Sequence, residues 1–510
     1  MCPLNESQAL LHGEQLIFKD DEGEKNKRDQ VEEEIHDGFF GRLQSNKVFA
    51  ELISLGKLVL PIVMTSLLLH TRSIVSMLFL GHLGRIELAG GSLAIAFANI
   101  TGYSVIKGLA MGMEPICCQA YGAKRWPVLG QTYLKTMFLL TVSCLPISLL
   151  WLNVETILKW LGQDPTIVSM ASVYLTFSLP DLIAQAHFYP LRIFLRTQNL
   201  ATPVTLASIC ALILHFPINY FLVIVLNMGV RGVSLASAWN TLNLNLALLL
   251  YLALSKKVLK PWDSALSILC FQGWQPLMAL AVPSVLSVCL EWWWYEVMLL
   301  LCGLLSNPQA SVAAMGILIQ VTGLIYVVPY SLSLGLSTRV GHELGANQPA
   351  RARLAAIVGL SVAAACGISA FVFTVSVRNI LGKVFTSEPQ ILQLISVALP
   401  ILGFCELGNC PQTAGCGALT GSARPKVGAK INFTSFYLIG LPVAALLGFA
   451  FKIGFVGLWL GLVAAQASCV CMIVYTLART DWKQQAKRAK ELTCNTEGAA
   501  GEDLEAALLR

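Results

Sequence analysis

Long apolar stretches recur along this chain from about residue 50 to residue 480, and short polar stretches separate them. Each is close to the ~20 residues that an α-helix needs to cross a bilayer. Backbone groups inside a bilayer must be hydrogen bonded within their own segment, so the pattern predicts an all-α membrane protein. The expected twelve spans lie at 52–73, 88–113, 129–152, 167–189, 203–225, 232–254, 274–303, 310–335, 353–376, 390–416, 427–449 and 455–477.

The two halves of the apolar region repeat each other. The segments "GMEPICCQAYGA" at Gly112 and "GLSTRVGHELGA" at Gly335 share a G-x9-G-A frame, 223 residues apart. Other glycines and prolines match at nearly the same offset. This predicts two six-helix lobes related by a pseudo-two-fold axis along the membrane normal. We expect a polar N-terminal tail, an N-lobe, a C-lobe and a C-terminal tail over 1–50, 51–255, 256–478 and 479–510.

Composition supports a membrane protein and charge indicates its orientation. The chain has 510 residues, of which 55% are hydrophobic and 13% charged, about half the charged fraction of a soluble domain. The even-numbered loops carry thirteen Lys and Arg residues and the odd-numbered loops six, which predicts that both tails are cytosolic. The net charge of +6 therefore reflects topology, and no nucleic-acid partner is expected.

The first fifty residues are polar, so no cleavable signal peptide is expected. They contain the acidic dileucine pattern "ESQALL", from Glu6 to Leu11, which slightly favours an internal membrane, vacuolar or endosomal, over the plasma membrane. Vacuolar, endosomal and plasma membranes all remain open. Most of the fifteen cysteines fall inside apolar stretches, where packing is the simplest role, and no metal site is expected.

Carboxylates inside the apolar stretches are the main candidates for chemistry. Glu291 and Glu296 flank the tryptophans of "EWWWYE", and Glu406 lies in the tenth expected span. A charged side chain near mid-membrane costs at least ~2.5–3.5 kcal/mol, which marks a functional position. Five residues turn an α-helix by about 500°, so only one of the first two can face a central cleft. The first half lacks counterparts of all three acids, and its own candidates are Asp181 and Glu114. Glu114 is expected to form a structural ion pair with the nearby Lys124 or Arg125.

An acid beside aromatic rings suits an organic cation. Burial favours the neutral form of a carboxyl group, so proton binding and cargo binding can exclude each other at one site. This predicts antiport driven by a proton gradient, with no other cofactor, although a protonated glutamate can also serve only as a hydrogen-bonding group. We expect the substrate cavity to include Asn99, Asp181, Trp294, Tyr295 and Gln320. Four prolines are candidate hinges or packing kinks: Pro61, Pro180, Pro283 and Pro400.

Three motifs resemble the multidrug and toxic compound extrusion family, MATE, and its plant detoxification branch: "EWWWYE", "GMEPICCQAYGA" and "CELGNCPQTAGCGALTGSARPKVGA". The resemblance covers roughly residues 50–480. It implies two lobes in a V shape, secondary-active efflux and, in eukaryotic members, proton antiport. The family's acid in the seventh span matches Glu291, and the second glutamate of the motif matches Glu296. The usual acid of the tenth span falls on Asn409, so either Glu406, one turn earlier, replaces it or Asn409 supports a different hydrogen-bond network.

The expected function is a proton-coupled antiporter that exports organic cations, plant metabolites or hormones by alternating access, as a monomer in the bilayer. The alternatives are a carrier for organic-acid or metal homeostasis and a lipid-linked flippase. A major facilitator carrier is disfavoured because the loop "YGAKRWPVLG" lacks the aspartate of that class. A receptor or scaffold is disfavoured by the short tails. An enzyme is not expected, because no metal set, phosphate loop or nucleophile–base pair stands out.

Overall fold

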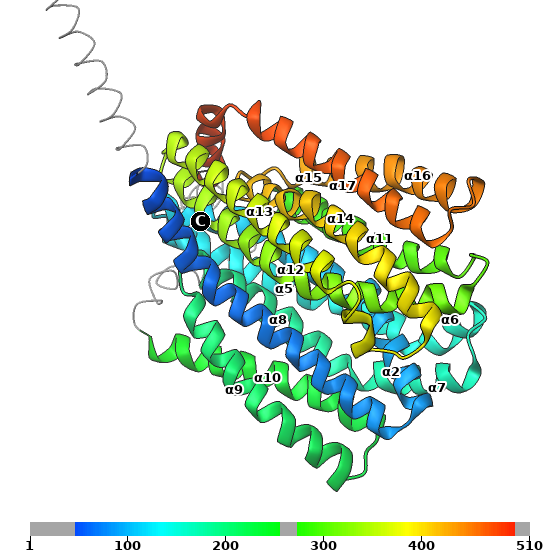
Figure 1. Cartoon of the computed structure of the whole chain (residues 1–510). Coiled ribbons are helices and arrows are strands. Elements are labelled where there is room, and N and C mark those ends of the chain that lie inside the picture. The colour runs from blue at the N-terminus through cyan, green and yellow to red at the C-terminus, as the bar shows by residue number, and fades with distance from the viewer. Residues whose placement is uncertain (1–45, 256–272, 495–510) are drawn as a thin grey trace, which may run out of the picture. The chain divides into compact units, whose positions relative to one another are not determined.

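A computed structural model describes residues 46–255 and 273–494. The motif "ESQALL" lies outside them, and so do the loop lysines at 256, 257 and 260. Residues Leu55–Arg510 form one compact unit, and the described part of it is helical throughout (Figure 1). The first half contains a helix over Asn46–Leu83, followed by α2 (Arg85–Ala98), η1 (Asn99–Tyr103), α3 (Ser104–Met111), α4 (Met113–Gly122), α5 (Trp126–Leu152), α6 (Val154–Trp160), α7 (Pro165–Phe177), α8 (Leu179–Thr197), α9 (Ala201–Tyr220), η2 (Phe221–Val225) and α10 (Val230–Leu254).

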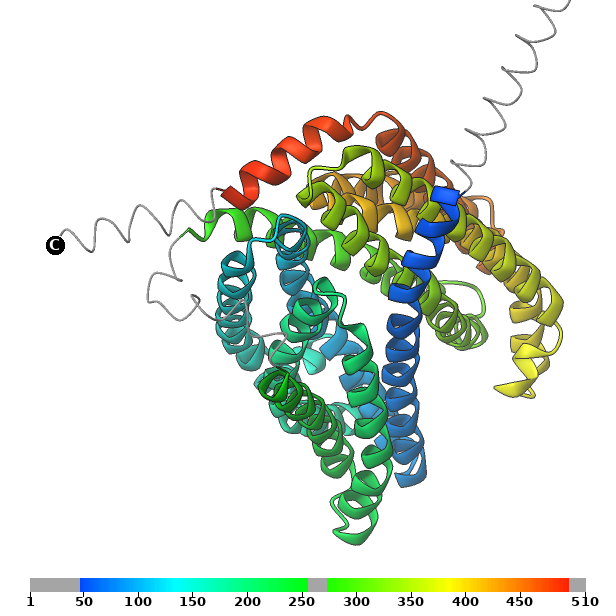
Figure 2. The same cartoon turned by 90° about the vertical axis from the view of Figure 1, so that its left-hand side faces the viewer.

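The second half follows with a similar order of helices. It contains α11 (Gln275–Cys302), α12 (Pro308–Gly345), α13 (Pro349–Val377), η6 (Leu381–Val384), α14 (Pro389–Gly421), α15 (Pro425–Asn432), η7 (Phe433–Gly440), α16 (Leu441–Ala445), η8 (Leu446–Ala450) and α17 (Phe455–Ala478). A further helix covers 482–494. Figure 2 shows it close to the beginning of α11, and Leu280 and Leu492 line one cleft between the two.

The predicted spans are confirmed in number, but several are longer than hydropathy indicates. Eleven helices in the described residues are long and apolar enough to cross a membrane, and a bent pair of helices brings the number to twelve. The eighth span was expected over 310–335 and extends over Pro308–Gly345. Its polar end is buried against the rest of the protein, as His342 and Glu343 show, so it needs no apolar sequence there.

The fourth span is broken where Pro180 lies. Pro165–Phe177 and Leu179–Thr197 are bent by 49°, and Pro180 is the second residue of α8. A proline is tolerated there because the first amides of a helix have no partner within the helix. Pro283 and Pro400, by contrast, lie inside the continuous helices α11 and α14.

The repeat is visible in the backbone itself. Residues with positive φ occur in pairs at the offsets found in the sequence: Lys124 with Asn347, Asn199 with Ala423, Asn227 with Lys452, and Gly229 with Gly454. The two glycines of the last pair begin α10 and α17 with nearly equal angles, φ 58°, ψ −134° and φ 67°, ψ −133°. The short π-helices η2 and η8 also match, 225 residues apart. The two halves therefore carry the same turns at equivalent places.

Each half has its own apolar core, and the halves meet through small residues. One core draws mainly on residues between Leu80 and Leu252, and a second on residues between Trp294 and Ala465. Helices α4 and α12 cross with their backbones in contact. A methyl group placed on Gly122 would lie 2.1 Å from the carbonyl oxygen of His342, and one on Gly345 would lie 2.0 Å from that of Gln119. These contacts exchange under the 223-residue offset, so the glycines of the two G-x9-G-A motifs form one pseudo-symmetric crossing.

Candidate functional site

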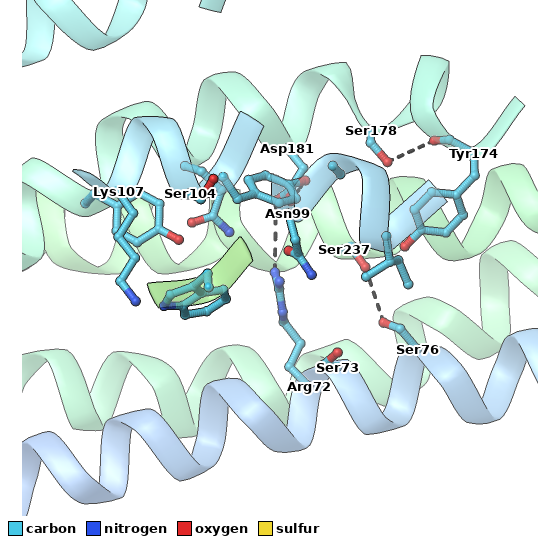
Figure 3. Close-up of a pocket in the computed structure, with 16 residues that line it drawn as sticks. Arg72, Ser73, Ser76, Asn99, Ser104, Lys107, Tyr174, Ser178, Asp181 and Ser237 are labelled. Atoms are coloured by element: carbon cyan, nitrogen blue, oxygen red, sulfur yellow. Dashed lines mark hydrogen bonds and ion pairs between the residues drawn. The ribbon is translucent and has the colours of Figure 1, made fainter. Parts of the chain in front are cut away.

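A cavity of about 190 Å³ lies mainly among helices of the first half, and we call it the first cavity. Figure 3 shows its polar side chains. It is lined by Arg72, Ser73, Ser76, Ile95, Ala98, Asn99, Tyr103, Ser104, Lys107, Tyr174, Ser178, Asp181, Gln185, Tyr189, Ser237 and Trp292. The π-helical turn η1 begins at Asn99, and such turns are frequent at functional sites.

Asp181 is the acidic group of the first cavity, and every partner it has comes from another span. Tyr103 Oη donates to Asp181 Oδ2 at 2.7 Å and Thr241 Oγ1 donates to Oδ1 at 2.5 Å. Arg72 Nη1 lies 4.0 Å from Oδ1 (Figure 3) and donates to Thr241 Oγ1 at 3.0 Å. A buried carboxylate with a cation and two hydroxyl donors is a satisfied group, and it ties the first, second, fourth and sixth spans together.

A second, smaller cavity of about 60 Å³ lies mainly among helices of the second half, and we call it the second cavity. It is lined by Lys107, Met111, Ser284, Ser287, Val288, Glu291, Trp292, Tyr326, Tyr330, Ser333, Thr413, Cys416, Leu419, Thr420, Pro425 and Gly428. Glu291 is its acidic group. Tyr326 Oη donates to Glu291 Oε1 at 2.9 Å, which fixes the carboxylate between α11 and α12.

Lys107 and Trp292 line both cavities. The Lys107 Nζ atom lies 4.6 Å from the centre of the Trp292 ring and 4.2 Å from that of Tyr330. It lines the second cavity together with Glu291. The arrangement depends on the close approach of α3 to α11, because a methyl group on Gly108 would lie 2.6 Å from Val285 Cα.

Glu406 and Asn409, which the sequence presents as alternatives, belong to one buried cluster. Asn409 Nδ2 donates to Glu406 Oε2 at 2.9 Å, and Gln466 Nε2 donates to Asn409 Oδ1 at 3.3 Å. Neither residue lines the two cavities. Tyr295 lies on α11 one helical turn after Glu291, near Glu406.

Three residues expected in the substrate cavity lie elsewhere. Trp294 is fully buried in the core of the second half, against Phe436. Gln320 is exposed on α12. Tyr295 lines neither cavity. Trp292, next to Glu291 in sequence, is the tryptophan of this motif that lines the two cavities.

Glu296 also lies apart from Glu291, as the helix rotation requires. It lines neither cavity and shares a face of α11 with Trp293 and Leu300, which are 40% and 74% exposed. Residues three and four apart form one helix surface, so Glu296 points away from the second cavity. Asn99 and Asp181, in contrast, line the first cavity as expected.

Sequence reasoning missed two cations in the cavities, Arg72 and Lys107. Both lie within membrane spans, whereas the charge pattern that predicts the topology involves only the Lys and Arg of the loops. A lysine or arginine inside an otherwise apolar span was the available signal, since such residues face a polar interior or an ion partner.

Comparisons with known proteins agree with this architecture. The MatE family model matches residues 61–221 and 283–446, two segments whose starts are 222 residues apart. Protein DETOXIFICATION 53 from Arabidopsis thaliana is 56% identical over 88% of this chain and 92% of its own length. Protein DETOXIFICATION 48 from the same plant is 55% identical over 88% of this chain and 84% of its own.

The crystal structure of a eukaryotic MATE transporter, AtDTX14, superimposes with a TM-score of 0.84 at 30% identity, covering 88% of this chain and 100% of that one. The Vibrio cholerae MATE transporter VcmN in the bent form shares the fold with a TM-score of 0.76 at 17% identity, covering 88% of this chain and 99% of that one. The chain is therefore a multi-pass membrane transporter and not an enzyme. It belongs to the MatE family and is similar to plant DETOXIFICATION proteins.

Proposed function

We propose that this transporter is a proton-coupled antiporter that exports small organic solutes from the cytosol by alternating access. It works as a single chain, with the proton gradient as its only driving force and both termini in the cytosol of a vacuolar, endosomal or plasma membrane. Its relatives bear the name DETOXIFICATION, which supports export. The observation that carries the proposal is that the carboxylate of Glu291 lines a cavity between α11 and α12, inside the membrane-spanning part of the chain.

In this mechanism Glu291 binds either a proton or the cargo. Tyr326 holds one carboxylate oxygen, which orients the group toward the second cavity. Cargo bound on the cytosolic side displaces the proton, and a proton arriving from the acidic side displaces the cargo. Because the two occupants exclude each other at one site, the proton gradient drives the organic solute outward.

The test uses purified protein in liposomes with a pH-sensitive dye inside and an imposed proton gradient. Organic solutes of different charge are added, and solute-dependent proton movement is followed by the dye. We expect the Glu291→Gln variant to lose this movement while remaining folded, because an amide cannot exchange a proton. Wild-type proton movement in Glu291→Gln would contradict the proposal.

Glu296→Gln is the matched control. It removes a second carboxylate from the same helix, five residues away, on a face that lines neither cavity. We expect its transport to stay near that of the wild type. If Glu296→Gln abolished transport and Glu291→Gln did not, the second cavity would not be the coupling site.

The cluster of Glu406 and Asn409 is proposed to relay protons to Glu291 by way of Tyr295, which lies one helical turn after Glu291 on α11. Glu406→Gln removes the ionisable group and should reduce coupled transport. Asn409→Asp restores an acid at the position usual in the family. It should be tolerated in the wild-type background and should restore coupled transport in the Glu406→Gln variant. If Glu406→Gln were silent, the cluster would have a structural role only.

The alternative of a carrier for organic acids has one specific observation in its favour. Arg72 and Lys107 both line the first cavity, and cations attract carboxylates. The two alternatives make different demands on the charge of the cargo.

A further inference from the structure

Lys107 is a charged group that the proton exchange proposed above does not use. It lies in the second span, lines both cavities, and among the described residues its ammonium has no carboxylate oxygen within 4.0 Å. Its close contacts are the ring faces of Trp292 and Tyr330. A lysine in the membrane interior is unfavourable enough that its presence needs a reason.

Two other cations of the first half, Arg72 and Arg196, have carboxylate partners, whereas Arg192 donates to the hydroxyl of Ser66. Arg72 has Asp181 at 4.0 Å and donates to Thr241, and Arg196 is 2.6 Å from Glu114. Ring faces attract a cation, but they do not serve its three N–H donors as a carboxylate does. Lys107 therefore presents a charge to the cavities that an anionic group on the cargo can engage.

We propose that the cargo is an organic zwitterion on an aromatic frame, whose anionic group binds Lys107 and whose cationic group binds Glu291. This inference rests on the proposed function, because Glu291 is the group that exchanges proton for cargo. It adds the chemical class of the substrate and assigns its recognition to a residue of the first half.

Charge balance favours a zwitterion over a simple cation or anion. With Lys107 and ionised Glu291 both lining the second cavity, a cationic cargo adds a second positive charge beside one carboxylate. An anionic cargo adds a second negative charge in the same way and would favour the protonated form of Glu291, which is the opposite of competition. A zwitterion matches both charges and keeps proton and cargo mutually exclusive at Glu291.

The walls of the site favour an aromatic frame. Trp292 lines both cavities, and Tyr326 and Tyr330 stack on each other with ring centres 5.6 Å apart at the rim of the second cavity. When an anionic group draws Lys107 away from the rings of Trp292 and Tyr330, those faces become available to a ring of the cargo, and aromatic rings pack favourably on each other.

The test compares four probes by isothermal titration calorimetry on full-length protein in lipid nanodiscs. Phenethylamine carries the cation alone, 3-phenylpropionate the anion alone, and phenylalanine both charges on the same ring and chain. A second zwitterion, 4-(aminomethyl)benzoate, places the charges at opposite ends of the ring. We expect at least one zwitterion to bind about tenfold more tightly than either singly charged probe, as one further charge-assisted hydrogen bond would give.

Variants of Lys107 then test its role through ratios of affinities, which a partly unfolded sample does not change. Lys107→Gln should remove the advantage of the zwitterion over phenethylamine, and Lys107→Arg should retain it. Lys107→Glu should reverse the order, so that phenethylamine binds more tightly than the zwitterion. Lys159→Gln, at an exposed lysine of α6 paired with Glu155, is the control and should leave all ratios unchanged.

The inference is overturned if phenethylamine binds the wild type as tightly as both zwitterions, if neither zwitterion binds at millimolar concentration, or if Lys107→Gln leaves the ratio unchanged. These results differ from failure of the proposed function, which would show as proton movement that persists in Glu291→Gln. A transporter that exchanged protons for phenethylamine through Glu291 would keep the proposed function and exclude the zwitterion.

Discussion

The buried charge of Glu114 is compensated by one partner from another helix. The sequence places Glu114 near Lys124 and Arg125, but its partner in the structure is Arg196 of α8, at 2.6 Å, with both side chains almost completely buried. The stability of such a buried ion pair depends on both partners, because either one alone would be an uncompensated buried charge.

This gives a prediction at the residue scale. Glu114→Gln should destabilise the protein by about 3–5 kcal/mol, because it leaves the guanidinium of Arg196 buried without a counter-charge. The double variant Glu114→Leu, Arg196→Met removes both charges and should come close to wild-type stability. Denaturant unfolding in detergent micelles measures both, and a double variant as unstable as the single one would show that the pair is not the cause.

A second residue-scale prediction concerns Tyr326. Tyr326→Phe removes the hydroxyl that donates to Glu291 and leaves the ring and its stacking on Tyr330 in place. A lost hydrogen bond to a charged group corresponds to about 1.5–3 kcal/mol, so coupled transport should fall by at least about tenfold. Dye-reported proton movement in liposomes measures the change, and an unchanged rate would show that Tyr326 does not orient Glu291.

At the scale of elements, particular side chains at the helix ends determine where a helix begins. Asp164 precedes α7 and caps it: its side chain accepts hydrogen bonds from the Thr166 hydroxyl and from the backbone amides of Thr166 and Ile167. These hydrogen bonds, that of the Thr166 side chain first, hold the pKa of Asp164 below its usual value. A carboxyl group with a lowered pKa in the folded state stabilises the helix end above the unfolded-state pKa, and this stabilisation disappears as pH falls through the folded value.

The expected result is a helix end that opens only in strong acid. Hydrogen–deuterium exchange at the amides of Thr166 and Ile167 should give protection factors, relative to the intrinsic rate at each pH, that are constant from pH 7 down to about 5 and that fall below pH ~4. Asp164→Asn keeps a capping oxygen and should abolish this pH dependence. A wild-type profile in Asp164→Asn would assign the pH dependence to another group.

The crossing of α4 and α12 depends on a single residue type, glycine. Gly345→Ala places a methyl group 2.0 Å from the Gln119 carbonyl oxygen, and backbone cannot move aside as a side chain can. Overpacking of this kind typically costs about 1–3 kcal/mol. Gly316→Ala on the same helix is the control, because its methyl group meets no atom within 4 Å. Thermal unfolding should separate the two variants, and equal stabilities would refute the tight crossing.

At the scale of the whole molecule the two contacts of this crossing form one unit. Gly122→Ala and Gly345→Ala each separate the same pair of backbones, so the double variant should lose less stability than the sum of the single losses. Contacts shared by neighbouring residues are not additive. Spin labels at Ala123 and Ala346, in a background without the exposed Cys210 and Cys471, should report a longer distance in each variant. Additive losses would mean that the two contacts are independent.

The overall architecture could be predicted from the sequence, because lipid imposes strong rules on span length and on glycine and proline at turns. The offsets between the motifs at Gly112 and Gly335 predicted the repeat that the backbone angles show. The faces of helices could not be predicted equally well. Trp292 and Trp294 lie two positions apart in the sequence, and only packing against Phe436 determines that Trp294 is in the core. Lys107 was overlooked because its role depends on a neighbour 185 residues away, Trp292.

The reciprocal contact of Gly122 with His342 and of Gly345 with Gln119 has a consequence for how this gene could change after its ancestral duplication. Each copy supplies both a glycine and the carbonyl that the other copy's glycine touches. A change at either glycine therefore disturbs both copies, whereas the acids at 291 and 406 are present in only one of them. Cargo chemistry can differ between the copies while this shared crossing keeps both to a common geometry.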